Sequence, residues 1–261
     1  MDTERRRNLV ERLSWDEVAR RIENGAAAIL PIGAAAKQHG FHLPLDTDRI
    51  QAEWLAAQIA GRIDALIWPI VAYGHYPAFV EYAGSASLSA PVFESVVEEI
   101  ATAIVGYGCR ALFVLDTGLS TRAPVDRALA QLGADNVLHV KIHEGARYRR
   151  AAKELAEQSH GSHADELETS LMLALAPHLV DMSRAEASPA VKGETPGPLT
   201  PSDLSSPNYS RSGSYGDPTL ATAGKGEILL AAMVEDLADQ VTAFLVAGKQ
   251  VGRKTKGDIS A

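Results

Sequence analysis

The stretch AAAILPIGAAAKQHGFHLPLDTD, residues 26–48, decides the fold of this chain. Residues 26–30 form a short apolar run that is typical of a buried strand, and glycines and prolines then exclude a helix before residue 46. The loop carries His39 and His42 and ends at Asp46 and Asp48. Because α/β enzymes build their sites on loops that follow strands, this pattern predicts a site loop. From spacing alone, the two histidines could be metal ligands, catalytic residues or surface polar residues without a specific role.

Strand and helix patterns alternate along the rest of the chain. Strand patterns occupy residues 26–32, 65–71, 110–115 and 137–142. Helical spacing occupies residues 14–24, 47–63, 91–106, 124–132, 146–158, 162–177 and 222–246. This alternation predicts an α/β fold with three layers, α/β/α, around a mostly parallel central sheet. We expect one domain over residues 1–250 and a disordered tail over residues 251–261.

Composition excludes several classes of partner. The net charge of −8 argues against a nucleic-acid ligand, which needs a basic surface. No apolar run approaches the roughly 18 residues that span a bilayer. The basic N-terminal stretch has no apolar segment behind it, so we expect no secretory signal and a cytoplasmic protein. The single cysteine, Cys109, excludes an internal disulfide and is expected to be a buried thiol.

Histidines and carboxylates follow several of the predicted strands. They occur in residues 39–48, 73–75, 116–120 and 143–144, which a parallel sheet would bring to one edge. Imidazole and carboxylate groups are ligands for zinc, manganese or iron. The chain has neither a nucleotide-binding glycine motif nor the Gly-x-Ser-x-Gly motif of serine hydrolases.

The segment from His163 to Glu168 is the second candidate. Its simplest interpretation is a helix start capped by Ser162, with Glu166 and Glu168 in solvent. Glu168, however, shares a helical face with the apolar residues that follow, so its carboxylate needs a cationic partner. His163 can reach Glu168 only if it lies ahead of the helix.

These residues resemble the creatininase family of creatinine amidohydrolase-like metal hydrolases. The matching pieces occur in order at residues 31–48, 82–88 (in weakened form), 163–170 and 216–226. The resemblance implies an α/β/α fold, a homo-oligomer such as a hexamer or trimer of dimers, and hydrolysis of C–N bonds in small cyclic compounds at a two-metal centre. It implies that His39 and Asp48 are metal ligands, with Asp48 bridging, and that His163 and Glu168 are site residues.

The chain departs from the family pattern at two ligand positions. Lys37 stands where the family usually has a glutamate, and the loop at residues 116–121 lacks the family's histidine. An ammonium group beside a divalent ion costs Coulomb energy instead of supplying a ligand. We therefore expect one divalent metal ion per chain instead of two, with zinc first and manganese or iron as alternatives. His75 or His143 could replace a missing ligand, although a surface position is expected for both.

The first hypothesis is a mononuclear metal hydrolase. His39, Asp48 and Glu168 would hold the ion, which activates a water molecule. His163 would act as a general acid or base near its usual pKa of about 6.5. Lys37 would bind a substrate oxygen. The substrate would be a small cyclic amide, or a related lactone or cyclic ketone.

Three further residues are expected at the substrate: His42, Asp116 and Tyr215, the last reaching in from the long segment 183–218. A structural role for His42 fits equally well. The alternative hypothesis, from a different class, is a non-catalytic subunit for binding or assembly whose metal centre has degraded. Tight metal binding without turnover of any cyclic amide, lactone or ketone would favour it.

Overall fold

The computed structural model of this protein describes residues 7–188 and 198–257. Four parallel strands form a sheet in the order β2–β1–β3–β4. The strands are β1 (Ala27–Ile32), β2 (Ala65–Ile67), β3 (Leu112–Asp116) and β4 (Val137–Lys141). Each coincides with a predicted strand pattern, and the parallel sheet of the α/β prediction is confirmed.

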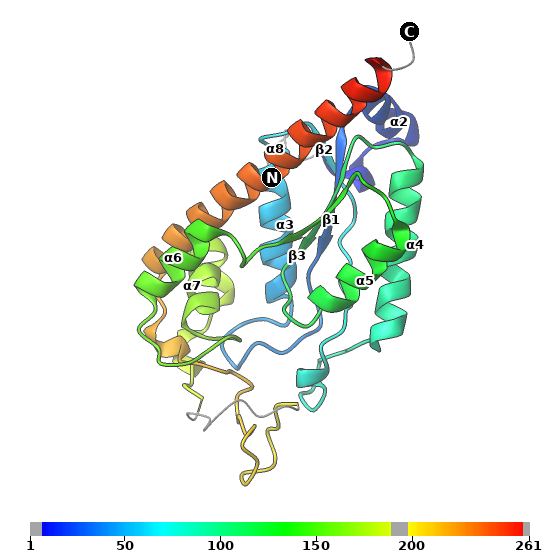
Figure 1. Ribbon diagram of the computed structural model, residues 1–261. Helices are drawn as coiled ribbons and strands as arrows, with labels where there is room; N and C mark the ends of the chain where they lie inside the picture. The colour runs from blue at the N-terminus through cyan, green and yellow to red at the C-terminus, as the bar shows by residue number, and fades with distance from the viewer. Residues whose placement is uncertain (1–6, 189–197, 258–261) are drawn as a thin grey trace.

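Helices cover both faces of this sheet, which confirms the three-layer architecture (Figure 1). One side carries α2 (Trp15–Glu23), α4 (Ala90–Gly106) and α5 (Arg122–Leu132). The other carries α3 (Thr47–Ala60), α6 (Ala146–Leu155), α7 (Glu166–Leu175) and α8 (Ala223–Gly257). Short 3-10 helices lie in the connections: η1 (Val10–Arg12), η2 (Pro77–Phe79), η3 (Pro177–Leu179), η4 (Met182–Arg184) and η5 (Pro218–Leu220).

Strand β1 shows why both faces must be covered. All six of its residues are buried. Ala27 and Ile29 join the core formed with α3 and α8, whereas Ala28, Leu30 and Ile32 join the core formed with α4 and α5. Alternate side chains of a strand point to opposite faces of the sheet. An uninterrupted apolar run therefore indicates a strand that is buried on both faces.

The start of α7 differs from the prediction. Its N-cap is Asp165, whose side chain accepts a hydrogen bond from Glu168 N (2.9 Å), so the prediction of Ser162 as the cap is wrong. Glu166, expected in solvent, is fully buried and forms an ion pair with Lys225 of α8. Local spacing did not reveal this burial, because the partner lies 59 residues further along the chain.

Helix α8 extends beyond its predicted end at residue 246 and continues through Gly257. Residues 251–257, for which the sequence predicts a disordered tail, are therefore helical, and residues 258–261 lie outside the described residues. A glycine inside a helix costs about 1 kcal/mol relative to alanine, which weakens a helix but does not end it.

Cys109 lies immediately before β3 and is only 3% exposed, as predicted for a buried thiol. Burial raises its pKa to about 11, so the reactive thiolate is disfavoured at neutral pH. Among the described residues, no helix combines the length and the apolar character needed to cross a bilayer.

The contact between α7 and α8 depends on Gly226. A Cβ atom at this position would lie 1.9 Å from Ser170 O and 3.0 Å from the Ala174 side chain. We therefore expect Gly226→Ala to force the helices apart and to lower the free energy of unfolding by about 3 kcal/mol in urea denaturation.

Gly224 is the matched control, because a Cβ there would meet no atom within 4 Å. Gly224→Ala should leave stability unchanged or raise it by up to about 1 kcal/mol. Equal effects of the two substitutions would contradict this description of the helix contact.

Candidate metal centre

The loop after β1 folds back onto the first turn of α3. A Cβ on Gly33 would lie 2.6 Å from Asp48 O, so only glycine permits this approach. Gly40 has φ +73°, in the left-handed region that favours glycine. A Cβ on Gly40 would also lie 2.8 Å from the His42 ring. These constraints place His39 beside Asp48 of α3.

His39 is fully buried, and its ring is oriented by the backbone. Its Nδ1 lies 2.8 Å from Lys37 O. A carbonyl oxygen only accepts hydrogen bonds, so Nδ1 carries the hydrogen and Nε2 presents a lone pair. This Nε2 lies 3.4 Å from Asp48 Oδ1 and 3.7 Å from Glu168 Oε1.

His163 lies ahead of α7, as convergence with Glu168 requires. Its backbone pairs with Tyr215, with Tyr215 N donating to His163 O over 2.8 Å. Its Nε2 lies 2.8 Å from Gln38 O and 3.2 Å from Gln38 Nε2. The shorter contact, to a carbonyl, assigns the hydrogen to Nε2. The other nitrogen, Nδ1, therefore presents its lone pair toward Glu168 Oε2, 3.7 Å away.

Glu168 is held by the backbone that precedes its own helix. Its Oε2 accepts a hydrogen bond from Ala164 N over 2.6 Å. Ala164 has φ +46°, a strained value for a residue with a side chain. This turn directs His163 and Glu168 toward each other.

His39, His163 and Glu168 form a group in which one donor atom from each residue lies within 4.8 Å of the others. The two imidazole rings are 4.8 Å apart between centroids. In metal sites, a ligating histidine commonly donates its second N–H to a carbonyl or carboxylate, which fixes the tautomer. Both rings have this arrangement, so the donor set fits a divalent metal ion.

Lys37 and Asp48 form a buried ion pair beside this group. Lys37 Nζ lies 2.6 Å from Asp48 Oδ2, and the two side chains are 9% and 5% exposed. Burial alone would raise the pKa of Asp48, but the Lys37 ammonium and then His39 hold it well below its usual range. The Asp48 carboxylate therefore lies between two groups. Its Oδ1 faces His39, and its Oδ2 pairs with the Lys37 ammonium.

The expectation that His163 titrates near 6.5 is wrong in the absence of metal. Burial, followed by the charges of His39 and Lys37, holds the pKa of His163 well below that value. A neutral imidazole is the form that binds metals.

The other predicted site residues lie around this centre. His42 donates to or accepts from Thr169 Oγ1 through Nε2 (2.8 Å), and burial and then His39 lower its pKa to about 4. Asp116 is fully buried and accepts hydrogen bonds from Thr121 Oγ1 (2.7 Å) and Gly118 N (2.9 Å) within its own loop. The Tyr215 ring contacts His160, 5.4 Å away between centroids.

Neither of the two histidines considered as replacement ligands belongs to the metal-binding group found in the described residues. His75 Nδ1 bonds Leu88 O over 2.9 Å. His143 packs against Tyr148, with ring centroids 5.4 Å apart. His143 is half-buried, and burial, and then the nearby Arg122 charge, lower its pKa to about 4.

Two aromatic residues were not identified as site residues from the sequence. The Phe79 ring lies 4.1 Å from the His163 ring between centroids. Lys37 Nζ lies 5.4 Å from the Phe79 centroid and 6.0 Å from that of Tyr76. Their segment has no periodicity, and its only signal was its unusual length.

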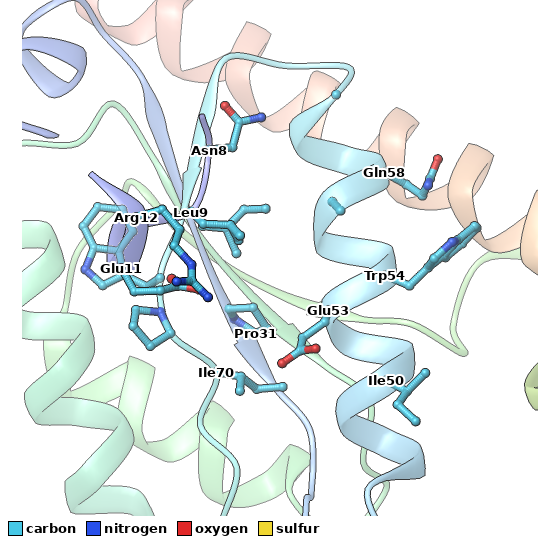
Figure 2. A pocket seen from close by; sticks show the side chains of 15 residues that line it. Asn8, Leu9, Glu11, Arg12, Pro31, Ile50, Glu53, Trp54, Gln58 and Ile70 are labelled. Carbon is cyan, nitrogen blue, oxygen red and sulfur yellow. The ribbon is translucent and has the colours of Figure 1, made fainter. Parts of the chain in front are cut away.

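A separate hollow lies between η1, α3 and the chain after β2 (Figure 2). Its lining includes Leu9, Pro31, Ile50, Trp54 and Ile70, and none of the residues described above. The lining is mainly apolar, and its main polar residues are Asn8, Glu11, Arg12, Glu53 and Gln58. It contains no histidine, so we place the metal chemistry at the histidine group.

The chain is similar to known proteins over most of its length. The family model "Creatininase: Creatinine amidohydrolase" matches residues 11–241. A creatinine amidohydrolase of Pseudomonas putida is 27% identical over 89% of this chain and 95% of its own length. A mycofactocin precursor peptide peptidase of Mycobacterium tuberculosis is 29% identical over 83% of this chain and 85% of its own. A crystal structure of creatinine amidohydrolase superposes with a TM-score of 0.78, at 26% identity over 90% of this chain and 96% of that one.

The chain therefore belongs to the creatininase family, whose members are metal-dependent amidohydrolases. The resemblance inferred from residues 31–48, 163–170 and 216–226 is confirmed, and so is the assignment as an enzyme of this class.

The buried ion pair makes a prediction about stability. Lys37→Met removes the partner of a buried carboxylate, so it should lower the free energy of unfolding by about 3–5 kcal/mol in urea with chelator present. The double variant Lys37→Met/Asp48→Asn should recover much of this loss, because no uncompensated charge remains.

Lys141→Met is the matched control. Its ion pair with Asp126 is more exposed, with side chains 22% and 50% accessible, so its loss should cost less than about 1 kcal/mol. A Lys37→Met protein as stable as the wild type would contradict the importance of the buried pair.

Proposed function

We propose that this chain hydrolyses a small carbonyl compound with one divalent metal ion, and that Lys37 replaces the second ion of the family. The substrate we propose is a cyclic amide, or a related lactone or cyclic ketone. His39, Asp48 and Glu168 would hold the ion, with His163 Nδ1 as a further donor.

The observation that carries this proposal is the orientation of the two imidazole rings. Each ring has one nitrogen occupied by a backbone carbonyl, Lys37 O or Gln38 O. The opposite nitrogens lie 3.7 Å from the two oxygens of Glu168. As neutral rings, both histidines direct a lone pair toward the Glu168 carboxylate, an arrangement that a cation between them would stabilise. A divalent ion would supply this positive charge.

The choice of metal follows from the donors. Imidazole and carboxylate ligands suit zinc, and manganese or iron accept them too. The ion would supply a bound water whose pKa is lowered toward about 7. We propose zinc, in a cytoplasmic homo-oligomer.

Lys37 has a role that a metal ligand would not have. Its ammonium has three N–H donors, and the Asp48 contact uses one. The remaining donors can bind a carbonyl oxygen and stabilise negative charge as that oxygen is attacked. The Phe79 and Tyr76 rings lie on this ammonium and exclude water, which strengthens the electrostatic interaction.

Metal content tests the proposal. Protein stripped with chelator and reloaded with zinc or manganese should contain one ion per chain by elemental mass spectrometry. His39→Ala should lose the ion, because it removes the donor that is completely enclosed. The control is His178→Ala on the exposed part of η3, which should retain the ion.

Hydrolysis is then measured on cyclic amides, lactones and cyclic ketones, with the ring-opened products detected by mass spectrometry. The loaded protein should hydrolyse at least one of these classes, and the stripped protein and His39→Ala should not. Two ions per chain, or full activity after stripping, would contradict the proposal. One bound ion without turnover of any class would favour the non-catalytic binding subunit.

A further inference from the structure

Arg122, the first residue of α5, has donors without acceptors. Its Nη1 lies 3.3 Å from Glu144 Oε1. Its Nε and Nη2 are shielded from solvent and have no hydrogen-bond partner within residues 7–188 and 198–257. Buried donors of a charged group are costly to leave unpaired, and native proteins rarely do so. An acceptor that residues 7–188 and 198–257 do not provide is therefore expected here.

His143, on the segment after β4, likewise has a polar nitrogen without a hydrogen-bond partner among the described residues. It directly precedes Glu144, the residue that holds Arg122 Nη1. Its Nδ1 is buried and also has no partner in the described part of the chain. Within that part, Arg122 and His143 thus offer three polar nitrogen atoms without partners, on the two segments that follow the neighbouring strands β3 and β4.

These residues lie near the metal centre. Burial lowers the pKa of His143 to about 4, and the charges of Arg122, Asp48 and Lys37 all act on it. Burial, then the charges of Asp165 and Glu168, raise the pKa of Tyr148, which packs on His143, whereas the charge of Arg122 lowers it. Strands β1, β3 and β4 are parallel neighbours in the sheet, so the loop that carries Lys37 and the segments that carry Arg122 and His143 leave the same edge. The unpaired donors therefore lie at the edge of the sheet that also carries the Lys37–Asp48 pair.

The geometry of the unpaired atoms selects the ligand. Nε and Nη2 form one edge of the planar guanidinium, which matches the two oxygens of a carboxylate. Arg122 supplies one positive charge, which Glu144 partly neutralises, and neutral His143 supplies none. Asp48 and Glu168 are both carboxylates in the same region, so a dianionic phosphate would meet more repulsion than a monoanion.

We propose that Arg122 and His143 form a subsite for a carboxylate group carried by the substrate. The substrate would then be a carbonyl compound with a second, non-reacting carboxylate, such as a lactam or lactone acid. The reaction at this substrate rests on the proposed function, whereas the binding of the carboxylate does not.

Calorimetric titration of the full chain tests the subsite without turnover. The probes are 5-oxoproline, a cyclic amide with a carboxylate, and 5-oxoprolinamide, its neutral counterpart, with acetate and inorganic phosphate as simple anions. Each is titrated into zinc-loaded and into chelator-treated protein. The acid should bind more tightly than the amide by about 10- to 100-fold, the range expected for a charge-assisted hydrogen-bonded pair.

Arg122→Gln should abolish this preference, and Arg122→Lys, which keeps the charge but not the planar edge, should restore it in part. The matched control is Arg127→Gln on the same helix, because Arg127 is exposed and already paired with Glu94. The Arg127→Gln variant should prefer the acid over the amide as strongly as the wild type does. Thermal melting of each variant shows whether it is folded.

Several results would overturn the subsite. They are equal binding of acid and amide, an unchanged preference in folded Arg122→Gln, no binding of any carboxylate at millimolar concentration, and tighter Arg122-dependent binding of phosphate than of acetate. Carboxylate binding that depends on Arg122 in a protein that neither holds metal nor hydrolyses any substrate would support the subsite and contradict the proposed function. One bound metal ion and turnover, without any preference for the acid, would support the proposed function and contradict the subsite.

Discussion

The buried pair of Lys37 and Asp48 is the interaction on which the rest of the site depends. Both side chains are almost fully removed from solvent, and their charged atoms are 2.6 Å apart. Desolvating two ions is costly, and their attraction offsets this only when the geometry is good. The pair also fixes the Asp48 carboxylate, because one oxygen is held by the ammonium and the other remains beside His39. The charge pattern of the centre follows from this arrangement.

The proposed replacement of a metal ligand by Lys37 would change what the centre can do. The family resemblance implies that Asp48 bridges two dications, and we propose that it here bridges one dication and one ammonium. The total positive charge is lower, but the ammonium brings N–H donors that a metal lacks. An oxygen that develops negative charge can then be bound by hydrogen bonds from Lys37. The loop at residues 116–121 has no histidine, which is consistent with the replacement of one metal ion by Lys37. In this loop Thr121 Oγ1 donates a hydrogen bond to Asp116.

Much of the fold could be predicted because its signals are local. Each strand is a short apolar run, and the glycines and prolines of residues 31–48 specify a loop. The helical face of Glu168 and the turn before its helix permitted the approach of His163 to Glu168 but did not require it. Glu166 could not be predicted as buried, because Lys225 compensates its charge from a distant helix. The Lys37–Asp48 contact and the stacking of Phe79 on His163 likewise join separate segments, and neither leaves a periodic signal in the sequence.

A crystal structure of the zinc-loaded protein, with anomalous data collected at the zinc edge, tests the central claim most directly. We expect one anomalous peak per chain, within about 2.0–2.2 Å of His39 Nε2 and of a Glu168 oxygen. Lys37 Nζ should remain paired with Asp48 Oδ2. A second peak on the Lys37 side of Asp48, with the lysine displaced, would contradict the account.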